Sequence, residues 1–206
     1  DQSYFLFATL QDQLDYVRFP LGNYLKSEIR QMANEYNLLV SDKPDSQDIC
    51  FVTSDSYRDL INKIQPNINK EGNIFDINGN NIGTHKGIAN YTVGQRKGIG
   101  VSGQDQPLYV KEVNKDQNYI VLSPLENLQK NKIFFKNINL LDKEIVNQEL
   151  ECSAKIRSTQ NEISGKLKII DDSGYFLFYE PVSATSPGQA CVFYKNEQVL
   201  GGGWIT

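Results

Sequence analysis

A proline-containing segment, Asp42–Phe51 (DKPDSQDICF), separates two parts of the chain that have different residue patterns. Pro44 has a fixed φ and no backbone N–H, so it ends any helix before it. Residues 1–40 carry apolar residues at helical spacing, whereas the chain after Pro66 consists of short apolar segments separated by glycine and asparagine turns. This change of pattern predicts an α+β protein, with a helical connector followed by two small antiparallel β-barrel-like domains.

Three helices are predicted before the β part. In the second, Ile29, Met32, Ala33 and Tyr36 recur at helical spacing, which predicts that this face packs in a core. Asn37 follows as a plausible C-cap. The three segments are the first ten residues, with Asp1 or Ser3 as the N-cap, then Ser27–Tyr36 and Ser56–Ile64, and a break is predicted at Arg18–Gly22.

The β part is predicted to form two domains joined by a linker at residues 124–133. The predicted domain boundaries are residues 1–57 for the helical connector with the Cys50 loop, 58–125 for a central β domain and 126–206 for a C-terminal β-barrel. The predicted central strands are Gly72–Ile77, Ile82–Ile88, Ala89–Val93, Leu108–Val113 and Tyr119–Leu122, and the C-terminal ones are Leu150–Ile156, Ile163–Ile170, Tyr175–Tyr179, Ala190–Tyr194 and Gln198–Leu200.

Three cysteines and one histidine limit the chemistry of the chain. An odd cysteine count without a CxxC argues against a disulfide framework and a zinc site, and a lone His85 excludes a histidine metal cluster. Cys152 and Cys191 lie in apolar strands and are predicted to be core residues. Cys50 stands at the edge of a polar loop, where it is either an accessible reactive thiol or a small buried hydrophobic residue. No signal peptide or membrane span is expected, so a reducing cytoplasm is the expected location.

Charge is unevenly distributed, although the chain as a whole carries a net charge of −4. Residues 66–140 carry nine Lys or Arg and six Asp or Glu, which indicates either a local anionic partner or a solvated surface. Within them, Gly94–Gly100 (GQRKGIG) places Arg96 and Lys97 between glycines, so this loop is either a candidate phosphate site or a β-turn with a basic tip. It has neither Walker nor dinucleotide-binding spacing.

A second cationic feature is predicted on the C-terminal sheet. Lys155 and Arg157 occupy alternate positions of a predicted strand, and Lys166 and Lys168 do so on the next. Side chains two residues apart on a strand share a face, so these cations form either an RNA-backbone contact or an ordinary solvated surface.

Taken together, these segments resemble the bacterial tRNA-specific 2-thiouridylase family, and the resemblance runs along essentially all of the 206 residues. The segments that carry it are DQSYFL at 1–6, FPLG at 19–22, DKPDSQDICF at 42–51, NYTVGQRKGIG at 90–100, PGQACVFY at 187–194 and LGGGWI at 200–205.

The resemblance implies an enzyme that uses ATP to place sulfur on C2 of the wobble uridine of tRNA. It implies that Cys50 carries the sulfur as a persulfide, received from a sulfur-relay protein or a cysteine desulfurase. A second cysteine in the family's N-terminal domain would form a disulfide with it. The implied tRNA-binding residues are Asp1, Gln2, Arg157, Ser158 and Gln189, although Ser158 replaces an aromatic residue expected at that position.

Two features of the family are missing from this sequence, and their absence changes what the chain is expected to do alone. The nucleotide-binding SGGxDS loop and the partner cysteine are absent from this sequence. We therefore expect the chain to be a portion of a longer enzyme that alone neither binds ATP nor thiolates tRNA. The alternatives are a non-catalytic RNA-binding β-barrel module, in which Cys50 is inert, and a β-barrel scaffold for protein contacts.

Overall fold

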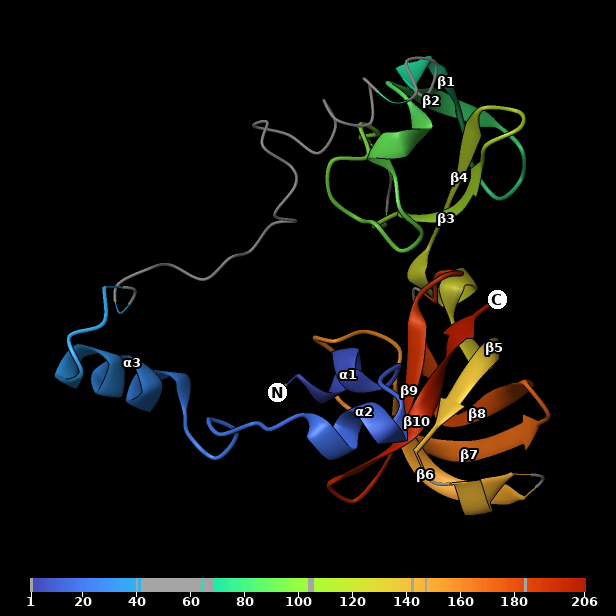
Figure 1. The fold of residues 1–206 in the computed structure, drawn as a ribbon. Coiled ribbons are helices and arrows are strands. Elements are labelled where there is room, and N and C mark those ends of the chain that lie inside the picture. The colour runs from blue at the N-terminus through green and yellow to red at the C-terminus, as the bar shows by residue number, and fades with distance from the viewer. Residues whose placement is uncertain are drawn as a thin grey trace.

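Helices precede two separate β domains in the computed structural model, which confirms the predicted α+β class (Figure 1). The helices are α1 (Ser3–Leu6), α2 (Gln11–Tyr16) and α3 (Lys26–Glu35). The structure describes residues 2–39, 41, 64, 69–103, 106–141, 143–146, 148–183 and 185–206, so Cys50, Asp1 and nearly all of the predicted helix at 56–64 lie outside the described residues.

The C-terminal domain is a closed six-stranded barrel with the strand order β10-β5-β8-β7-β6-β9. Alternation of side chains along the strands turns one face inward, and Ile133, Phe135, Leu167, Phe176 and Phe193 fill the interior. The strands are β5 (Lys130–Leu140), β6 (Glu149–Lys155), β7 (Ile163–Ile170), β8 (Ser173–Val182), β9 (Ala190–Lys195) and β10 (Gln198–Ile205).

The first barrel strand corrects the predicted linker at residues 124–133. A short 3-10 helix, η3 (Leu125–Leu128), is followed directly by β5, which pairs with both β8 and β10 and closes the barrel. Three lysines at the start of β5 obscured its pattern, but Ile133 and Phe135 alternate inward as a barrel strand requires.

The central domain contains a four-stranded sheet in the order β2-β1-β4-β3. It is mixed, because β1 pairs antiparallel with β2 but parallel with β4, and this pairing differs from the predicted all-antiparallel arrangement. The strands are β1 (Gly72–Phe75), β2 (Asn81–His85), β3 (Tyr109–Asn114) and β4 (Tyr119–Ser123). Its core consists of Ile74, Ile88, Ile99, Val110, Ile120 and Leu122.

The predicted strand at Ala89–Val93 is wrong. Gly87 has a φ of 101°, and the chain then forms the 3-10 helix η2 (Ile88–Asn90). The Asn90 side chain donates to the carbonyls of Lys86 and Gly87 at 2.9 and 3.1 Å, which stabilises this turn in place of strand pairing.

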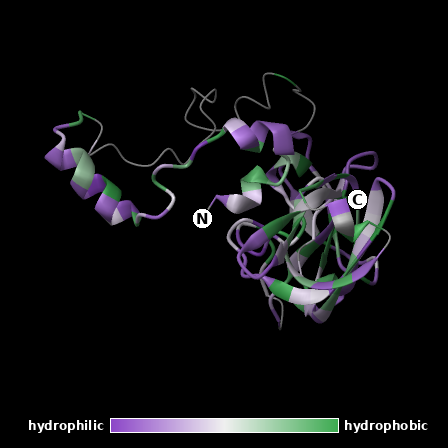
Figure 2. Ribbon diagram, turned by 60° about the horizontal axis from the view of Figure 1, so that its bottom comes forward, coloured by the Kyte–Doolittle hydropathy of each residue, from purple (hydrophilic) through white to green (hydrophobic). Residues whose placement is uncertain are grey.

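Helix α3 forms as predicted, but its apolar stripe does not pack in a described core. The Glu28 side chain accepts a hydrogen bond from the Leu25 backbone N–H at 2.6 Å, and Asn37 ends the helix with a φ of 54°. No residue of α3 is buried, and Tyr36 is exposed. Figure 2 shows hydrophilic and hydrophobic residues alternating along this helix.

Strand β9 is buried on both faces, and this feature joins the N-terminal helices to the barrel. Cys191 and Phe193 face the barrel core, while Ala190, Val192 and Tyr194 form a second cluster on the outer face with Phe7. The outer face of β9 is therefore covered by the segment that begins with α1 (Figure 1).

Candidate nucleic-acid interface

The α1 helix is held on the outer face of β9 by two tyrosines. The Tyr4 hydroxyl donates to the carbonyl of Ala190 at 2.9 Å, and the Ser3 hydroxyl hydrogen-bonds with the Tyr194 hydroxyl at 3.3 Å. Gln2 precedes these contacts directly as the N-cap residue of α1. Gln2 therefore stands at the start of the helix that is anchored on β9, two residues before Tyr4.

Arg157 and Gln189 reach the same end of β9. Strand β6 pairs antiparallel with β9 as far as Lys155, which lies opposite Val192, so Arg157, two residues further on, lies towards the Ala190 end of β9. Gln189 directly precedes Ala190, the residue that accepts the Tyr4 hydrogen bond. Three predicted tRNA-binding residues, Gln2, Arg157 and Gln189, therefore converge around Tyr4, although they lie far apart in the sequence.

The backbone of Gln189 is fixed and its side-chain oxygen is unsatisfied. The Ile205 backbone N–H donates to the Gln189 carbonyl at 2.8 Å, and the Gly188 N–H donates to the Ile205 carbonyl at 2.8 Å. The Gln189 Oε1 atom is buried without a hydrogen-bond partner among the described residues. A buried acceptor in this state is costly, so a ligand that donates a hydrogen bond here would relieve a real deficit.

The predicted cationic strip is corrected by the structure. β6 ends at Lys155, so Arg157 lies in the bend that follows and does not share a strand face with Lys155. Lys166 lies 3.1 Å from Glu149 on the neighbouring strand, and Lys155 lies 3.9 Å from Glu162. Two of the predicted cations are therefore paired with carboxylates, whereas Arg157 belongs to the end of the barrel, beside the exposed Ser158.

The loop with Arg96 and Lys97 is held by the side chain of Gln95. This side chain accepts from the Thr92 backbone N–H at 3.0 Å and donates to the Lys97 carbonyl at 3.0 Å. The loop is also tied to β3, because Gly94 N–H donates to Val110 and Val110 N–H donates to Gln95, at 2.7 and 2.9 Å. Arg96 and Lys97 are thus exposed side chains on a fixed turn.

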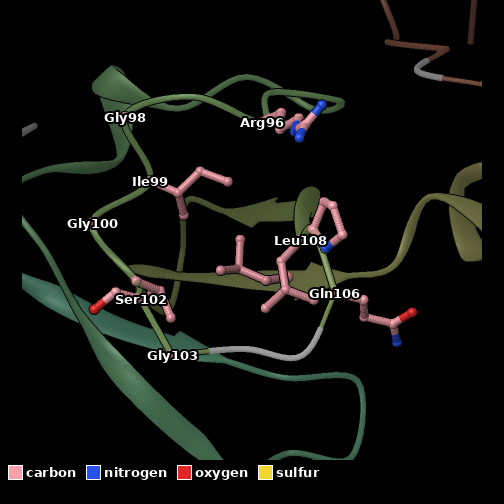
Figure 3. Close-up of a pocket in the computed structure, with 11 residues that line it drawn as sticks. Arg96, Gly98, Ile99, Gly100, Ser102, Gly103, Gln106 and Leu108 are labelled. Carbon is pink, nitrogen blue, oxygen red and sulfur yellow. The ribbon is translucent and has the colours of Figure 1, made fainter.

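A pocket of about 450 Å³ lies beside this loop (Figure 3). The Ile99 and Leu108 side chains lie in its middle in the figure, with Arg96 and Gln106 at opposite borders. It contains Arg96 but not Lys97, so the structure separates the two predicted phosphate contacts. The residues that line it are Arg96, Gly98, Ile99, Gly100, Val101, Ser102, Gly103, Gln106, Pro107, Leu108 and Leu122.

One hydrogen bond links the neighbourhood of this loop to the barrel. The Ser186 hydroxyl donates to the Val93 carbonyl at 3.5 Å. Ser186 belongs to the turn that leads to Gln189, and Val93 directly precedes the Gly94–Gly100 loop. The two cationic regions around Arg96 and Arg157 therefore belong to domains that contact each other at this turn.

The single histidine is structural. His85 is 1% exposed, and its Nδ1 accepts from the Gly87 backbone N–H at 3.1 Å, while its Nε2 lies 3.2 Å from the Asn118 carbonyl. Both ring nitrogens are thus satisfied by backbone groups inside the central domain. His85 is therefore a core residue whose two ring nitrogens are engaged within the central domain.

Cys152 and Cys191 are core residues, as predicted. Both are free thiols in or against the barrel core, and Cys191 is fully buried. Burial raises the pKa of Cys152 to about 12 and raises that of Cys191 well above its ordinary value. Because the thiolate is the nucleophile, neither side chain is suited to sulfur transfer in the folded barrel.

These two thiols are expected to resist iodoacetamide in the native protein. At pH 8, a pKa of about 12 leaves roughly one thiolate in 10⁴ at Cys152. Since the folded pKa of Cys152 lies above its unfolded value, the contribution of this thiol to stability is complete below pH 9 and is lost as the pH rises towards 12. Peptide mass spectrometry after alkylation should find both unmodified at pH 8 and modified in guanidinium. Alkylation of native Cys152 or Cys191 at pH 8 would contradict their burial.

Sequence reasoning missed the residues that assemble the interface. Tyr4 was assigned only to a helix, and Tyr194 and Asn139 were given no role. Asn139 on β5 donates from its side chain to the carbonyls of Phe7 and Thr9, at 2.7 and 2.9 Å. A signal was present in β9, where five consecutive apolar residues indicate a strand covered on both faces.

The described residues contain neither a metal-ligand cluster nor a membrane-spanning helix. Within the ranges that the structure describes, no three His, Cys, Asp or Glu side chains gather as a metal ion would require. Among the same ranges, no helix combines the length and the apolar character needed to cross a membrane.

Three family profiles match successive parts of the chain. Residues 1–54 match the tRNA methyl transferase HUP domain, residues 58–124 the tRNA methyl transferase PRC-barrel domain, and residues 130–205 the aminomethyltransferase beta-barrel domain. Together these matches cover nearly the whole chain.

Curated relatives match the chain from end to end. Proteins named tRNA-specific 2-thiouridylase MnmA are 47% identical in Rickettsia felis and 46% identical in Rickettsia canadensis and Rickettsia massiliae, each over 208 aligned residues and 100% of this chain. The chain spans 57%, 56% and 57% of the lengths of these relatives, respectively. Sequence matches along its full length show that the chain belongs to the tRNA-specific 2-thiouridylase family.

Proposed function

We propose that this chain forms the sulfur-carrying and tRNA-binding part of a tRNA-uridine 2-sulfurtransferase that thiolates the wobble uridine. The observation that carries the proposal is that the segments with Gln2, Arg157 and Gln189 meet where Tyr4 packs on β9, in a chain whose relatives are named for tRNA 2-thiolation. A cation and a buried unsatisfied amide at one place suit an RNA backbone with its 2′-hydroxyl groups.

Within this proposal, Cys50 is the catalytic residue. Its thiolate accepts a sulfur atom from a cysteine desulfurase or a sulfur-relay protein and holds it as a persulfide. The terminal sulfur then attacks C2 of the uridine, and a second cysteine releases it by forming a disulfide with Cys50. Support comes from the sequence context of Cys50 and from the exclusion of Cys152 and Cys191 by burial.

ATP has no place among the residues of this chain. Its role in the reaction would be to convert the C2 oxygen of the uridine into a leaving group. The sequence has no SGGxDS loop, and the relatives extend beyond the length that this chain matches. We therefore place the ATP site outside the 206 residues and derive no step of this chain's chemistry through it.

We further propose that residues 1–57, 58–125 and 126–206 act as three functional units in the cytoplasm. The first would carry Cys50, the second the Arg96 loop and the third the barrel end with Arg157 and Gln189. The separate hydrophobic clusters of the central domain and the barrel support this division.

The tRNA-binding part of the proposal predicts that Arg157→Gln weakens binding of the chain to tRNA about tenfold and lowers the salt slope of log K by about 1. Glutamine keeps a polar side chain with N–H donors but lacks the charge that would contact phosphate. Filter binding between 50 and 200 mM salt measures both quantities. Lys166→Gln is the matched control, because this cation already pairs with Glu149. Equal losses of tRNA affinity for both variants would show that binding depends on general electrostatic attraction and not on a site at the barrel end.

A non-catalytic RNA-binding module is the second candidate. It is favoured by one observation, namely that the interface around Tyr4 is built entirely from non-catalytic side chains of α1 and the barrel. Such a module would bind tRNA but would neither take up sulfur on Cys50 nor respond to a Cys50 substitution.

A further inference from the structure

We propose that the pocket beside the Gly94–Gly100 loop binds one unstacked nucleotide, with its phosphate at Arg96 and its base on the apolar floor of the pocket. The pocket is the one lined by Arg96, Ile99, Ser102, Gln106, Leu108 and Leu122 (Figure 3). In its RNA form the proposal rests on the proposed function, because the nucleotide would then belong to tRNA. This site belongs to the central domain, whereas Arg157 and Gln189 belong to the barrel.

The size and the lining fit a flat ligand of nucleotide dimensions. A volume of about 450 Å³ falls in the lower part of the roughly 300–1,000 Å³ range of ligand pockets. Ile99 and Leu122 belong to the buried core of the domain, and Leu108 packs against it, so the floor is rigid and apolar. A pocket of this size admits one base but not a base pair, so an RNA ligand must present an unstacked nucleotide.

The charge of the pocket selects an anion. Among the described residues that line it, Arg96 is the charged one, and the remaining polar side chains are the neutral Ser102 and Gln106. A planar guanidinium binds phosphate through two parallel hydrogen bonds, whereas the Gln106 amide can both donate to and accept from a base edge. The combination of one cation, one amide and an apolar floor matches a nucleotide better than it matches an inorganic anion.

Glycines let the ligand approach the main chain closely. Gly98, Gly100 and Gly103 have φ values of 71°, 82° and 80°, and a Cβ placed on any of them would meet nothing within 4 Å. The backbone of this loop therefore borders open space, and its conformation is one that residues with side chains rarely adopt. Exposed backbone next to a cation is a common feature of phosphate-binding loops.

The loop is ordered before any ligand binds. The Gln95 side chain bridges Thr92 and Lys97, and Tyr91 donates its hydroxyl to the Ile99 carbonyl at 3.4 Å. These bonds fix the loop backbone on both sides of Arg96, so little backbone conformational entropy is lost on binding. Arg96 and Lys97 are adjacent, exposed and equally charged, but only Arg96 lines the pocket, which provides an internal control.

Amide chemical shifts of the ¹⁵N-labelled chain test the site directly. Uridine 5′-monophosphate, adenosine 5′-monophosphate and inorganic phosphate are titrated separately, and the Gly98, Gly100 and Gly103 amides are followed. Saturable shifts with either nucleotide, at concentrations at least about tenfold below those needed for phosphate, are expected. Ser102→Trp should fill the pocket and abolish these shifts, while Ser102→Ala should leave them. Shifts that follow phosphate alone, or that survive Ser102→Trp, would overturn the proposal.

Binding of tRNA to charge variants identifies the source of the nucleotide. If it belongs to RNA, Arg96→Gln lowers tRNA affinity about tenfold, whereas Lys97→Gln lowers it about twofold through general electrostatics. If nucleotides bind but the two variants bind tRNA equally, the ligand is a free nucleotide and the RNA form is rejected. If the wild-type chain does not bind tRNA, the proposed function fails, and the nucleotide titration still decides the pocket.

Discussion

Replacing Phe7 with alanine is expected to cost about 3–5 kcal/mol of stability, the largest loss we expect from one residue outside the barrel. Phe7 is 4% exposed on the outer face of β9, where it packs with Ala190, Val192 and Tyr194. Its ring also meets Trp204 edge to face, with 5.3 Å between ring centroids. Removing the ring would leave a cavity beneath the chain segment that holds α1 on the barrel.

The position of Phe7 depends on a glycine of β10. A Cβ on Gly202 would lie 2.6 Å from Cδ2 of Phe7 and 2.8 Å from the Cys191 carbonyl oxygen, so the ring occupies space that any other residue would claim. Asn139 also holds the backbone of Phe7 by its side-chain amide. Gly202→Ala is therefore expected to destabilise the protein by displacing the ring, at a cost of about 1–3 kcal/mol.

Chemical denaturation of four variants tests this arrangement. Phe5→Ala is the matched control, because Phe5 lies in α1, which ends just before Phe7, but is 65% exposed, and it should cost less than about 1 kcal/mol. The Phe7→Ala and Gly202→Ala double variant should cost less than the sum of its single variants, because the methyl group at position 202 occupies part of the vacated space. Equal losses for Phe5→Ala and Phe7→Ala, or strict additivity, would contradict this packing.

The local pattern was sufficient to predict many elements of the fold but not how they meet. Strand alternation and turn residues such as Asn37 and Asn196, both with positive φ, located α3 and the hairpin between β9 and β10. The parallel pairing of β1 with β4 depends on contacts some 45 residues apart in the sequence, which no local period encodes. Local pattern likewise did not predict the lysine-rich start of β5, which is a strand because it pairs with β8.

The candidate interface also depends on contacts between distant segments, which the local sequence pattern does not predict. The resemblance identified Gln2, Arg157 and Gln189 separately, but their common neighbour Tyr4 became visible only through its hydrogen bond to Ala190, 186 residues away. The alternating spacing predicts that Arg157 shares a strand face with Lys155, whereas β6 ends at Lys155, before the chain reaches Arg157. The pocket beside Arg96 could not be predicted either, because its floor comes from the packed core of the sheet.

Replacing Cys50 with serine is expected to remove persulfide formation almost completely, by at least about a hundredfold. Serine keeps the size and polarity of the side chain but has no thiolate to accept sulfur. Cys152 and Cys191 should not compensate, since burial raises the pKa of both thiols and keeps them protonated. Cys50 lies outside the described residues, so this prediction rests on its sequence context and on the elimination of the other two cysteines.

Intact-mass analysis after incubation with a cysteine desulfurase and cysteine, or with a small-molecule persulfide, measures the addition of sulfur. The small-molecule donor removes the need for a partner surface, so a missing adduct cannot be attributed to failed recognition. Cys152→Ala is the matched control, because it also removes one thiol but should keep the adduct. An adduct that persists in Cys50→Ser would exclude Cys50 as the carrier. An adduct absent from the wild type with both donors would favour the RNA-binding module, in which Cys50 has no chemical role.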